Sequence, residues 1–398
     1  MNELWKRPTR MALAALLSLV LALPAYAQTR EQARRIHDRL AGVPPTESVL
    51  QAMTNASQAS HAICTAKSVS GAACAAYIAM EDPSFYNVTL KNFAAPWTNR
   101  EFNVFVPLND YIATVIGLIR DDSDFRTVLY ADVQYIGQPG TVNANVSGSN
   151  NTHYEQLEAG NHNLKDVLVR RTQSEFNGLP SNAAAGVITS RAAAEAFFIA
   201  GTNRAMFRFT MVNHFCKDME QLTDPSLSPD RIRQDVSRSP GGDSRLFLNN
   251  CVGCHTGMDP MAQAFAFYNY NDATGSIEYT AGNVQPKYFN NDLNFPQGFR
   301  TPDDSWTNYW RNGQNRYLGF YGPDNGEGIG AQSLGRELAH SDAFAQCQVR
   351  KVFKAVCLRE PETTTDHTNF DQFVANFASS GYQMKKVFAD TAEYCMGQ

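Results

Sequence analysis

The sequence lacks a second closely spaced pair of metal ligands. Cys251 and Cys254 form its only C-x-x-C, and it contains no H-x-x-H. A structural zinc site uses two such pairs, so the spacing does not predict zinc. The βαβ pattern that accompanies a thioredoxin-like redox pair is also missing around these cysteines. Two common uses of this cysteine spacing are therefore disfavoured.

Long apolar runs and basic blocks are scarce as well. Beyond the N-terminal segment, no stretch is apolar enough over a sufficient length to cross a membrane. Without residues 1–27 the chain has 371 residues, of which 31 are basic and 38 acidic, for a formal charge of −7. This mildly acidic balance disfavours nucleic acid as a partner.

The N-terminus has the layout of a secretory signal peptide, residues 1–27. A basic start precedes an apolar run over residues 11–23, and Ala25-Tyr26-Ala27 forms a small-x-small cleavage site. A membrane anchor is the alternative, but the apolar run is short for one. We expect cleavage after Ala27 and export to the periplasm or the cell surface.

The segment CVGCH at residues 251–255 matches the signature of covalent haem attachment. One turn of chain separates Cys251 from Cys254, so both sulfurs can reach the two vinyl groups on one porphyrin edge. His255 follows directly and is predicted to be the proximal ligand of the haem iron. Phe247 is expected on the helix face that packs against the haem edge. Because the motif occurs once, the sequence predicts one covalent haem c.

The other six cysteines are expected to form disulfides, as exported proteins usually do. Cys64 and Cys74 close a short loop and are the preferred pair. Cys347 and Cys357 lie ten residues apart on a predicted helix, so they do not easily pair with each other. They are expected to pair with Cys216 and Cys395, in an order that the sequence leaves open.

The ligand opposite His255 is not evident from the sequence. Met258 and Met261 follow His255 too closely to go round the porphyrin, since six extended residues reach about 20 Å. Between Met261 and His340 there is neither Met nor His. A lysine ligand or an open position also remains, and for each candidate a role as a core or capping residue is the favoured reading. The distal candidates are His340, His214 and Met211, followed by Met206 and Met384.

Apolar residues at helical spacing predict a mainly α fold. Gly42 and the prolines after it are expected to end the first helix, and Ser123 is a possible N-cap between two helices. Predicted helices cover residues 30–42, two segments within 46–80, two within 109–137, and then 190–220, 341–358 and 368–395.

Three polar or aromatic segments read as loops. Residues 138–165 are rich in Gly, Asn and Ser and are predicted to be a loop with at most a short hairpin. His153 and His162 lie in this segment, but a metal site formed by this pair is disfavoured. Residues 223–243 read as a linker between a helical domain (28–240) and a cytochrome c-like haem-binding domain (241–398). The aromatic segment 268–333 is typical of loops that bury a flat cofactor or bind a partner.

These segments resemble the planctomycete-type cytochrome c-like family, in which a helical region precedes a C-terminal C-x-x-C-H module. The resemblance rests on DDSDFRTVLYADVQYI (121–136), GVITSRAAAEAFFIAGTNR (186–204) and CVGCHTGMDPMAQAF (251–265), followed by the closing helices at 341–362 and 380–392. It implies a secreted protein that holds haem c through Cys251, Cys254 and His255. It also implies that Met258-Asp259-Pro260 supports the proximal side of the haem.

Three functions follow from a single exported haem. The preferred one is electron transfer to a redox protein partner, with the thioether edge as the exit for the electron. The second is a peroxidase- or oxygenase-like haem enzyme, which requires an open distal face and an acid–base residue such as His214 or His340. The third is an envelope binding protein in which haem stabilises the fold and the segment 268–333 binds an outside ligand.

Overall fold

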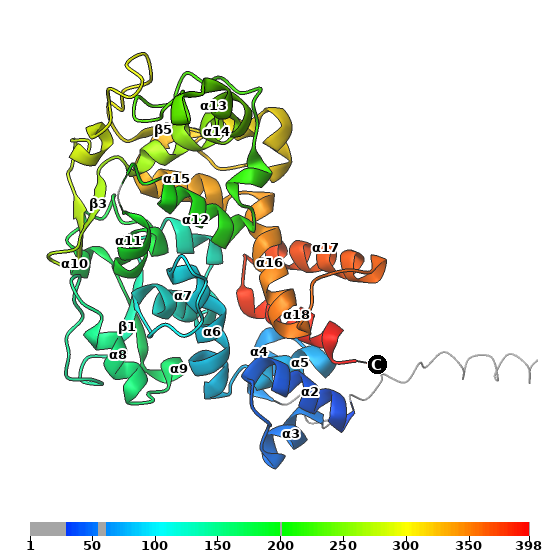
Figure 1. Ribbon diagram of the computed structural model, residues 1–398. Helices are drawn as coiled ribbons and strands as arrows, with labels where there is room; N and C mark the ends of the chain where they lie inside the picture. Colours follow the sequence, from blue (N-terminus) through cyan, green and yellow to red (C-terminus); the bar gives the residue numbers. More distant parts are fainter. Residues whose placement is uncertain (1–28, 55–60, 200, 398) are drawn as a thin grey trace, which may run out of the picture.

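A computed structural model describes residues 29–54, 61–199 and 201–397 of the chain (Figure 1). The fold is mainly α, as predicted. The predicted signal peptide lies outside the described residues. Across the described ranges, no helix has both the length and the apolar character needed to span a membrane.

Most of the described chain is organised into short and medium helices joined by irregular segments. The α-helices are α2 (Arg30–Ala41), α3 (Glu47–Thr54), α4 (Ala62–Lys67), α5 (Gly71–Ala79), α6 (Lys91–Ala94), α7 (Asp110–Arg120), α8 (Thr152–Ala159), α9 (Leu164–Val167), α10 (Ser174–Asn177), α11 (Arg191–Phe197), α12 (Arg204–Phe215), α13 (Ser244–Asn250), α14 (Val252–Ala262), α15 (Gly330–Ala339), α16 (Asp342–Cys357), α17 (Thr364–Ser379) and α18 (Met384–Cys395).

A π-helical turn and several 3₁₀ segments lie between these helices. The π-helical turn is η2 (Phe85–Leu90). The 3₁₀ segments are η3 (Ala95–Thr98), η4 (Phe125–Leu129), η5 (Gly186–Thr189), η6 (Met219–Leu222), η7 (Pro240–Gly242), η8 (Gln263–Phe265), η9 (Pro286–Phe289), η10 (Tyr309–Arg311) and η11 (Gly313–Leu318).

The strands form three separate two-stranded antiparallel sheets. β1 (Gln134–Gly137) pairs with β2 (Leu168–Arg171), β3 (Tyr268–Asn271) with β4 (Ser276–Tyr279), and β5 (Ser305–Thr307) with β6 (Glu327–Ile329). Within the described residues these small sheets are minor additions to a helical core.

Local sequence signals define α2 as predicted. The Thr29 side chain accepts a hydrogen bond from Gln32 N, and the Gln32 side-chain oxygen accepts one from Thr29 N, which completes a capping box. Gly42 ends the helix in the left-handed conformation, with φ 73°. Ile36 and Leu40 point into the core and are fully buried.

The region 109–137 contains one of the two predicted helices. Asn109 caps α7, but the second segment is the 3₁₀ helix η4 followed by strand β1, and its N-cap is Asp124 rather than Ser123. The prediction of a second α-helix was wrong, because the β-strand pairing of residues 134–137 with β2 overrides a pattern that local spacing alone favours.

Two other predicted boundaries also change. Residues 46–80 hold α3, α4 and α5 instead of two helices. The segment 138–165 is not only loop, since α8 and the start of α9 lie within it. The buried face of α8 carries His153, Tyr154 and Leu157, so tertiary packing selects a helix in a polar stretch.

The predicted linker, residues 223–243, packs against the aromatic segment. Phe299 N donates to Ile232 O at 2.9 Å, and Gln234 N donates to Phe299 O at 3.0 Å. Ile232 and Val236 are buried with Phe247 in a small apolar cluster. This segment is therefore part of the packed structure and not a free linker.

The largest apolar core joins the two ends of the chain. Helix α5 packs against α2, α3 and α18, and α18 also packs against α16 and α17. In Figure 1 the N-terminal helices, in blue, lie beside α16, in orange, and α18, in red. One continuous core runs from Ala33 to Ala392. Residues on both sides of the predicted boundary at 240 share it, and the division into two domains stays a prediction.

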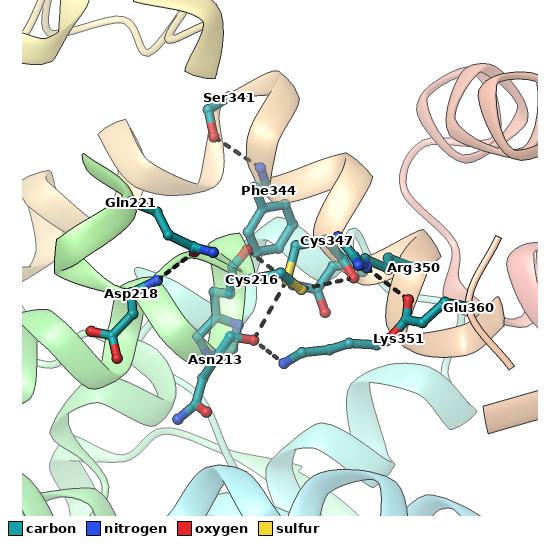
Figure 2. The surroundings of a disulfide bond; sticks show 12 residues. Asn213, Cys216, Asp218, Gln221, Ser341, Phe344, Cys347, Arg350, Lys351 and Glu360 are labelled. Carbon is teal, nitrogen blue, oxygen red and sulfur yellow. Dashed lines mark hydrogen bonds and ion pairs between the residues drawn. A yellow bond between two sulfur atoms is a disulfide. The ribbon is translucent and has the colours of Figure 1, made fainter. Parts of the chain in front are cut away.

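Three disulfides fasten this core. Cys64 pairs with Cys74, which confirms the prediction for that pair. Cys216 pairs with Cys347, and Cys357 with Cys395, so the order left open by the sequence is now assigned. Figure 2 shows the Cys216–Cys347 bond, which joins the end of α12 to α16. Nearby, Ser341 caps α16 by accepting a hydrogen bond from Phe344 N.

Candidate functional site

The CVGCH segment lies where two helices meet. Cys251 ends α13 and is also the N-cap of α14. Cys254 and His255 follow in the first turn of α14. Successive helical residues are about 100° apart, so positions 251, 254, 255 and 258 lie on one side of the helix. The spacing therefore places both thiols and the imidazole on the same side of α14.

The opposite side of α14 packs tightly against the rest of the chain. A Cβ atom at Gly257 would lie 2.0 Å from Trp310 Nε1, and one at Gly253 would lie 2.4 Å from Thr223 Cγ2. Only glycine allows such a close approach without displacing the neighbour. These two contacts turn the side that carries the CVGCH side chains toward the surface.

The two cysteines of the motif are unpaired and half-buried. Cys254 Sγ lies 3.4 Å from Met219 O and 3.3 Å from Thr223 Oγ1. Cys251 packs against the small cluster of Ile232, Val236 and Phe247. The Phe247 ring centroid lies 6.2 Å from that of His255, on the side of α14 that carries the motif.

A buried carboxylate one helical turn further along α14 orients His255. His255 Nδ1 lies 3.0 Å from both carboxylate oxygens of Asp259. The Asp259 side chain is fully buried, whereas that of His255 is 18% exposed. Because an ionised carboxylate only accepts, Nδ1 carries the proton and donates it. Within the described ranges Nε2 has no hydrogen-bond partner, so it is the nitrogen left to bind a metal.

Arg204, at the start of α12, holds the same carboxylate. Its Nε donates to Asp259 Oδ1 at 2.8 Å and its Nη2 to Asp259 Oδ2 at 3.2 Å. The two Nη groups also donate to the oxygens of Asp235, each at 3.0 Å. Burial alone would raise the pKa of Asp259, but Arg204 and His255 outweigh it and lower that pKa well below its usual value. Asp259 is therefore ionised.

This set of groups fits a covalently attached haem. Two free thiols and an imidazole with Nδ1 already engaged are the donors that thioether attachment and proximal ligation use. The hydrogen bond to Asp259 fixes the tautomer and orientation of His255, as carboxylates commonly do for ligating histidines. The implied supporting role of Asp259 thus has a physical basis in this hydrogen bond.

His214 lies in a different part of the core from His255. Its Nε2 is 2.9 Å from Tyr111 Oη, and its ring packs between Trp97 and Phe344. Burial lowers the pKa of His214 well below its usual value, and the nearby Lys351 lowers it further. These contacts come from α7, η3 and α16, and none of them involves the exposed side of α14.

The other distal candidates occupy core or capping positions. His340 Nδ1 donates to Arg336 O at 2.8 Å, and its ring lies beside Tyr130 and Tyr321. The three methionines, Met206, Met211 and Met384, are buried in the main core. The identity of the ligand opposite His255 stays a prediction.

The aromatic segment makes contacts that the sequence did not suggest. Four aromatic rings between residues 288 and 299 stack on arginine side chains, three of which come from residues 231–238. Each guanidinium carbon lies within 5 Å of a ring centroid, as is typical of cation–π contacts. The pairs are Arg231–Phe299, Arg233–Tyr288, Arg238–Phe295 and Arg300–Phe289, at 4.9, 4.1, 4.2 and 4.6 Å. An arginine therefore lies over one face of each of these rings.

The suggested metal pair at His153 and His162 has no support in the contacts of His153. Its Nδ1 donates to Ala144 O at 2.8 Å, and its Nε2 accepts from Gly137 N at 2.9 Å. Both ring nitrogens therefore serve the backbone. In the part of the chain that the structure describes, no group of three or more His, Cys, Asp or Glu side chains converges to hold a metal ion.

Arg204 and Asp235 were not identified from the sequence. Asp259 lies four residues after His255 and could be placed by helical spacing. Arg204 and Asp235 lie 55 and 24 residues before Asp259, and only tertiary packing brings them to it. The Thr-Asn-Arg ending of the segment 186–204, which carries part of the family resemblance, was the one sequence feature that pointed to Arg204.

Comparison of the chain with known protein families, with curated proteins and with solved structures finds no match. The resemblance to the planctomycete-type cytochrome c-like family therefore stays a prediction, and the site is interpreted from its own chemistry.

Proposed function

We propose that this protein is an exported c-type cytochrome that binds one haem covalently through Cys251 and Cys254 and transfers electrons to a redox protein partner. His255 is the proximal ligand in this proposal. When bound, the haem supplies reversible one-electron chemistry at its iron.

One observation carries the proposal. Six of the eight cysteines form disulfides, whereas the two that are only three positions apart stay unpaired. They lie on the same side of α14 as a histidine whose Nδ1 is bonded to a buried carboxylate. A disulfide-forming compartment would be expected to oxidise a free C-x-x-C pair, and thioether bonds would protect both sulfurs.

The surroundings of the motif support electron transfer more than enzyme catalysis. Cys251, Cys254 and His255 are half-buried, so this side of α14 is close to the surface. Leu246 and Leu248 on α13, just before Cys251, are 47% and 61% exposed and suit contact with a partner protein. The acid–base candidate His214 is instead bonded to Tyr111 and is fully buried.

The disulfides support export. Three disulfides are typical of proteins that mature in an oxidising compartment, such as the periplasm or the cell surface. Covalent attachment also suits such a compartment, because a thioether-linked haem stays bound when the fold opens.

Expression in a host that matures c-type cytochromes tests the proposal. The wild-type chain should carry haem that remains after denaturation and organic extraction, and Cys251→Ala/Cys254→Ala should carry none. The matched control is Cys64→Ala/Cys74→Ala, which removes a disulfide and should keep the haem. Equal haem content in both double variants, or none in the wild type, would refute the proposal.

The absorption spectrum of the purified protein separates carrier from enzyme. A low-spin, six-coordinate spectrum that carbon monoxide does not change is expected for electron transfer. A high-spin ferric spectrum with ready binding of cyanide would favour a haem enzyme instead.

A further inference from the structure

We propose that Arg204 is a positioning residue that sets how strongly His255 donates electrons to the iron, by controlling the charge on Asp259. Asp235 acts as the second partner that shares the Arg204 guanidinium. The inference rests on the proposed function, and it gives a role to Arg204 and Asp235, which neither the motif nor the resemblance assigns to the site.

The geometry places one cation between two carboxylates. Arg204 gives two hydrogen bonds to Asp259 and two to Asp235. Asp259 is therefore shared between Arg204 on one side and His255 on the other. The side chains of Asp259 and Asp235 are 0% and 11% exposed, so water screens these interactions only weakly.

Sharing the carboxylate controls the hydrogen bond to His255. A carboxylate with no cation beside it accepts strongly from an imidazole N–H and pushes electron density onto the ring. Arg204 donates hydrogen bonds to the same carboxylate and neutralises part of its charge, and so weakens the hydrogen bond that Asp259 accepts from His255 Nδ1. Asp235 in turn competes with Asp259 for the Arg204 guanidinium. The strength of the His255–Asp259 bond thus depends on how the guanidinium is divided between the two acids.

A purely mechanical role is the alternative explanation. Arg204 joins α12 to α14 and to the segment around Asp235, so it could simply hold these parts together. The two explanations differ in sign. If Arg204 were only a clamp, any substitution in the network would loosen the site in the same way. If it sets charge, removing the cation and removing an anion must have opposite effects.

Midpoint potentials of the haem-loaded protein test this difference. Arg204→Gln should lower the potential, because an unshared Asp259 makes His255 a stronger donor and stabilises ferric iron. Asp259→Asn should raise it for the opposite reason. Asp235→Asn should raise the potential by less, because it leaves Arg204 free to take more of the charge of Asp259 without removing that charge. Asp235→Asn is also the milder variant if substitutions at the buried positions impair folding.

Arg208→Gln is the matched control. Arg208 lies one turn further along α12 and binds Asp218 through two hydrogen bonds, but both side chains are largely exposed, at 49% and 38%. It should leave the potential unchanged. Shifts of the same sign in Arg204→Gln and Asp259→Asn, or equal shifts in Arg204→Gln and Arg208→Gln, would overturn the inference.

A second measurement does not depend on haem. In full-length Cys251→Ala/Cys254→Ala protein, the NMR signal of the His255 Nδ1 proton reports the strength of its hydrogen bond. It should move downfield on adding Arg204→Gln and upfield on adding Asp259→Asn. If the wild-type chain binds no haem while these shifts appear, the proposed function fails, and what stands is the control of the His255–Asp259 hydrogen bond by Arg204. Unchanged shifts in both variants would overturn the role itself.

Discussion

Two regions of the molecule are stabilised in different ways. The terminal bundle, formed by α2, α3, α5, α16, α17 and α18, is packed from apolar side chains and closed by disulfides. The motif region, residues 219–329, has short elements; it adds side chains such as Met261, Trp306 and Trp310 to the main core, and it also holds two small apolar clusters of its own. Its segments are joined by arginine–aromatic stacking and by the ion pairs around Arg204.

The difference shows how the protein separates stability from site geometry. Apolar packing is strong but has little directional preference, so it suits the bundle. Hydrogen bonds and ion pairs have fixed directions, so they can hold an imidazole and a carboxylate in one orientation. Substitutions in the bundle should mainly change the free energy of unfolding, and those in the motif region should mainly change local geometry.

The largest effect on stability is expected from the bundle. Phe388 is fully buried, and its ring packs edge-on against Phe85 and Phe93. Phe388→Ala should lower the free energy of unfolding by about 3–5 kcal/mol, because it leaves a cavity. Urea unfolding measures this change. The control is Phe105→Ala, where the ring is 90% exposed and the change should stay within about 0.5 kcal/mol. Equal costs would contradict the comparison.

A smaller effect is expected where α14 meets Trp310. Gly257→Ala places a methyl group against the indole and should cost about 1–3 kcal/mol. The cost should shrink when Trp310→Ala is also present, since the collision is then removed. A double-mutant cycle by urea unfolding measures the coupling. Additive costs would show that this contact does not hold α14 in place.

Loss of the arginine–aromatic stacking should lower the free energy of unfolding by less than the two changes above. The Arg238 guanidinium stacks on Phe295 and donates to the carbonyl oxygens of Ile232, Arg233 and Val236. Arg238→Ala should lower the free energy of unfolding by about 1–2 kcal/mol.

The control for Arg238 is Arg245→Ala. Arg245 pairs with Asp243 on the surface and its side chain is 82% exposed, so its loss should cost clearly less than the loss of Arg238. A larger loss for Arg245 than for Arg238 would refute the role given to the stacking.

A separate effect concerns the pH dependence of stability in the motif region. Burial raises the pKa of Asp304 to about 6. The folded state then binds more protons than the unfolded state between pH about 4 and 6. The stabilisation by protonated Asp304 is therefore complete below pH about 4 and is lost as the pH rises through 6.

Asp304→Asn should remove this decline in the free energy of unfolding. Asp303→Asn, at the neighbouring position, should keep most of it, because burial raises the pKa of Asp304 more than the charge of Asp303 does. Urea unfolding at several pH values between 4 and 7 makes the comparison, and a decline of the same size in all three proteins would exclude Asp304 as its source.

The sequence predicted best what depends on neighbouring residues. The limits of α2 follow from the capping box at Thr29 and from Gly42, and the loop between Cys64 and Cys74 closes as expected. The prediction of a second helix in 109–137 was wrong because residues 134–137 pair with β2, more than thirty residues further along the chain. Local patterns carry no information on such contacts.

The same distinction applies to the site. Cys251, Cys254, His255 and Asp259 lie within nine residues, so helical spacing places them together. Arg204 and Asp235 reach Asp259 only through the packing of α12 and of the segment before α13. The arginines of residues 231–238 could not be assigned to the aromatic rings for the same reason.

The most direct test of the account is a peptide measurement. After maturation in a competent host, trypsin should release residues 246–287, which contain both motif cysteines and no internal lysine or arginine. We predict that this peptide carries the mass of one haem and that Cys251 and Cys254 resist alkylation after reduction. A peptide with two alkylated cysteines and no added porphyrin would contradict the account.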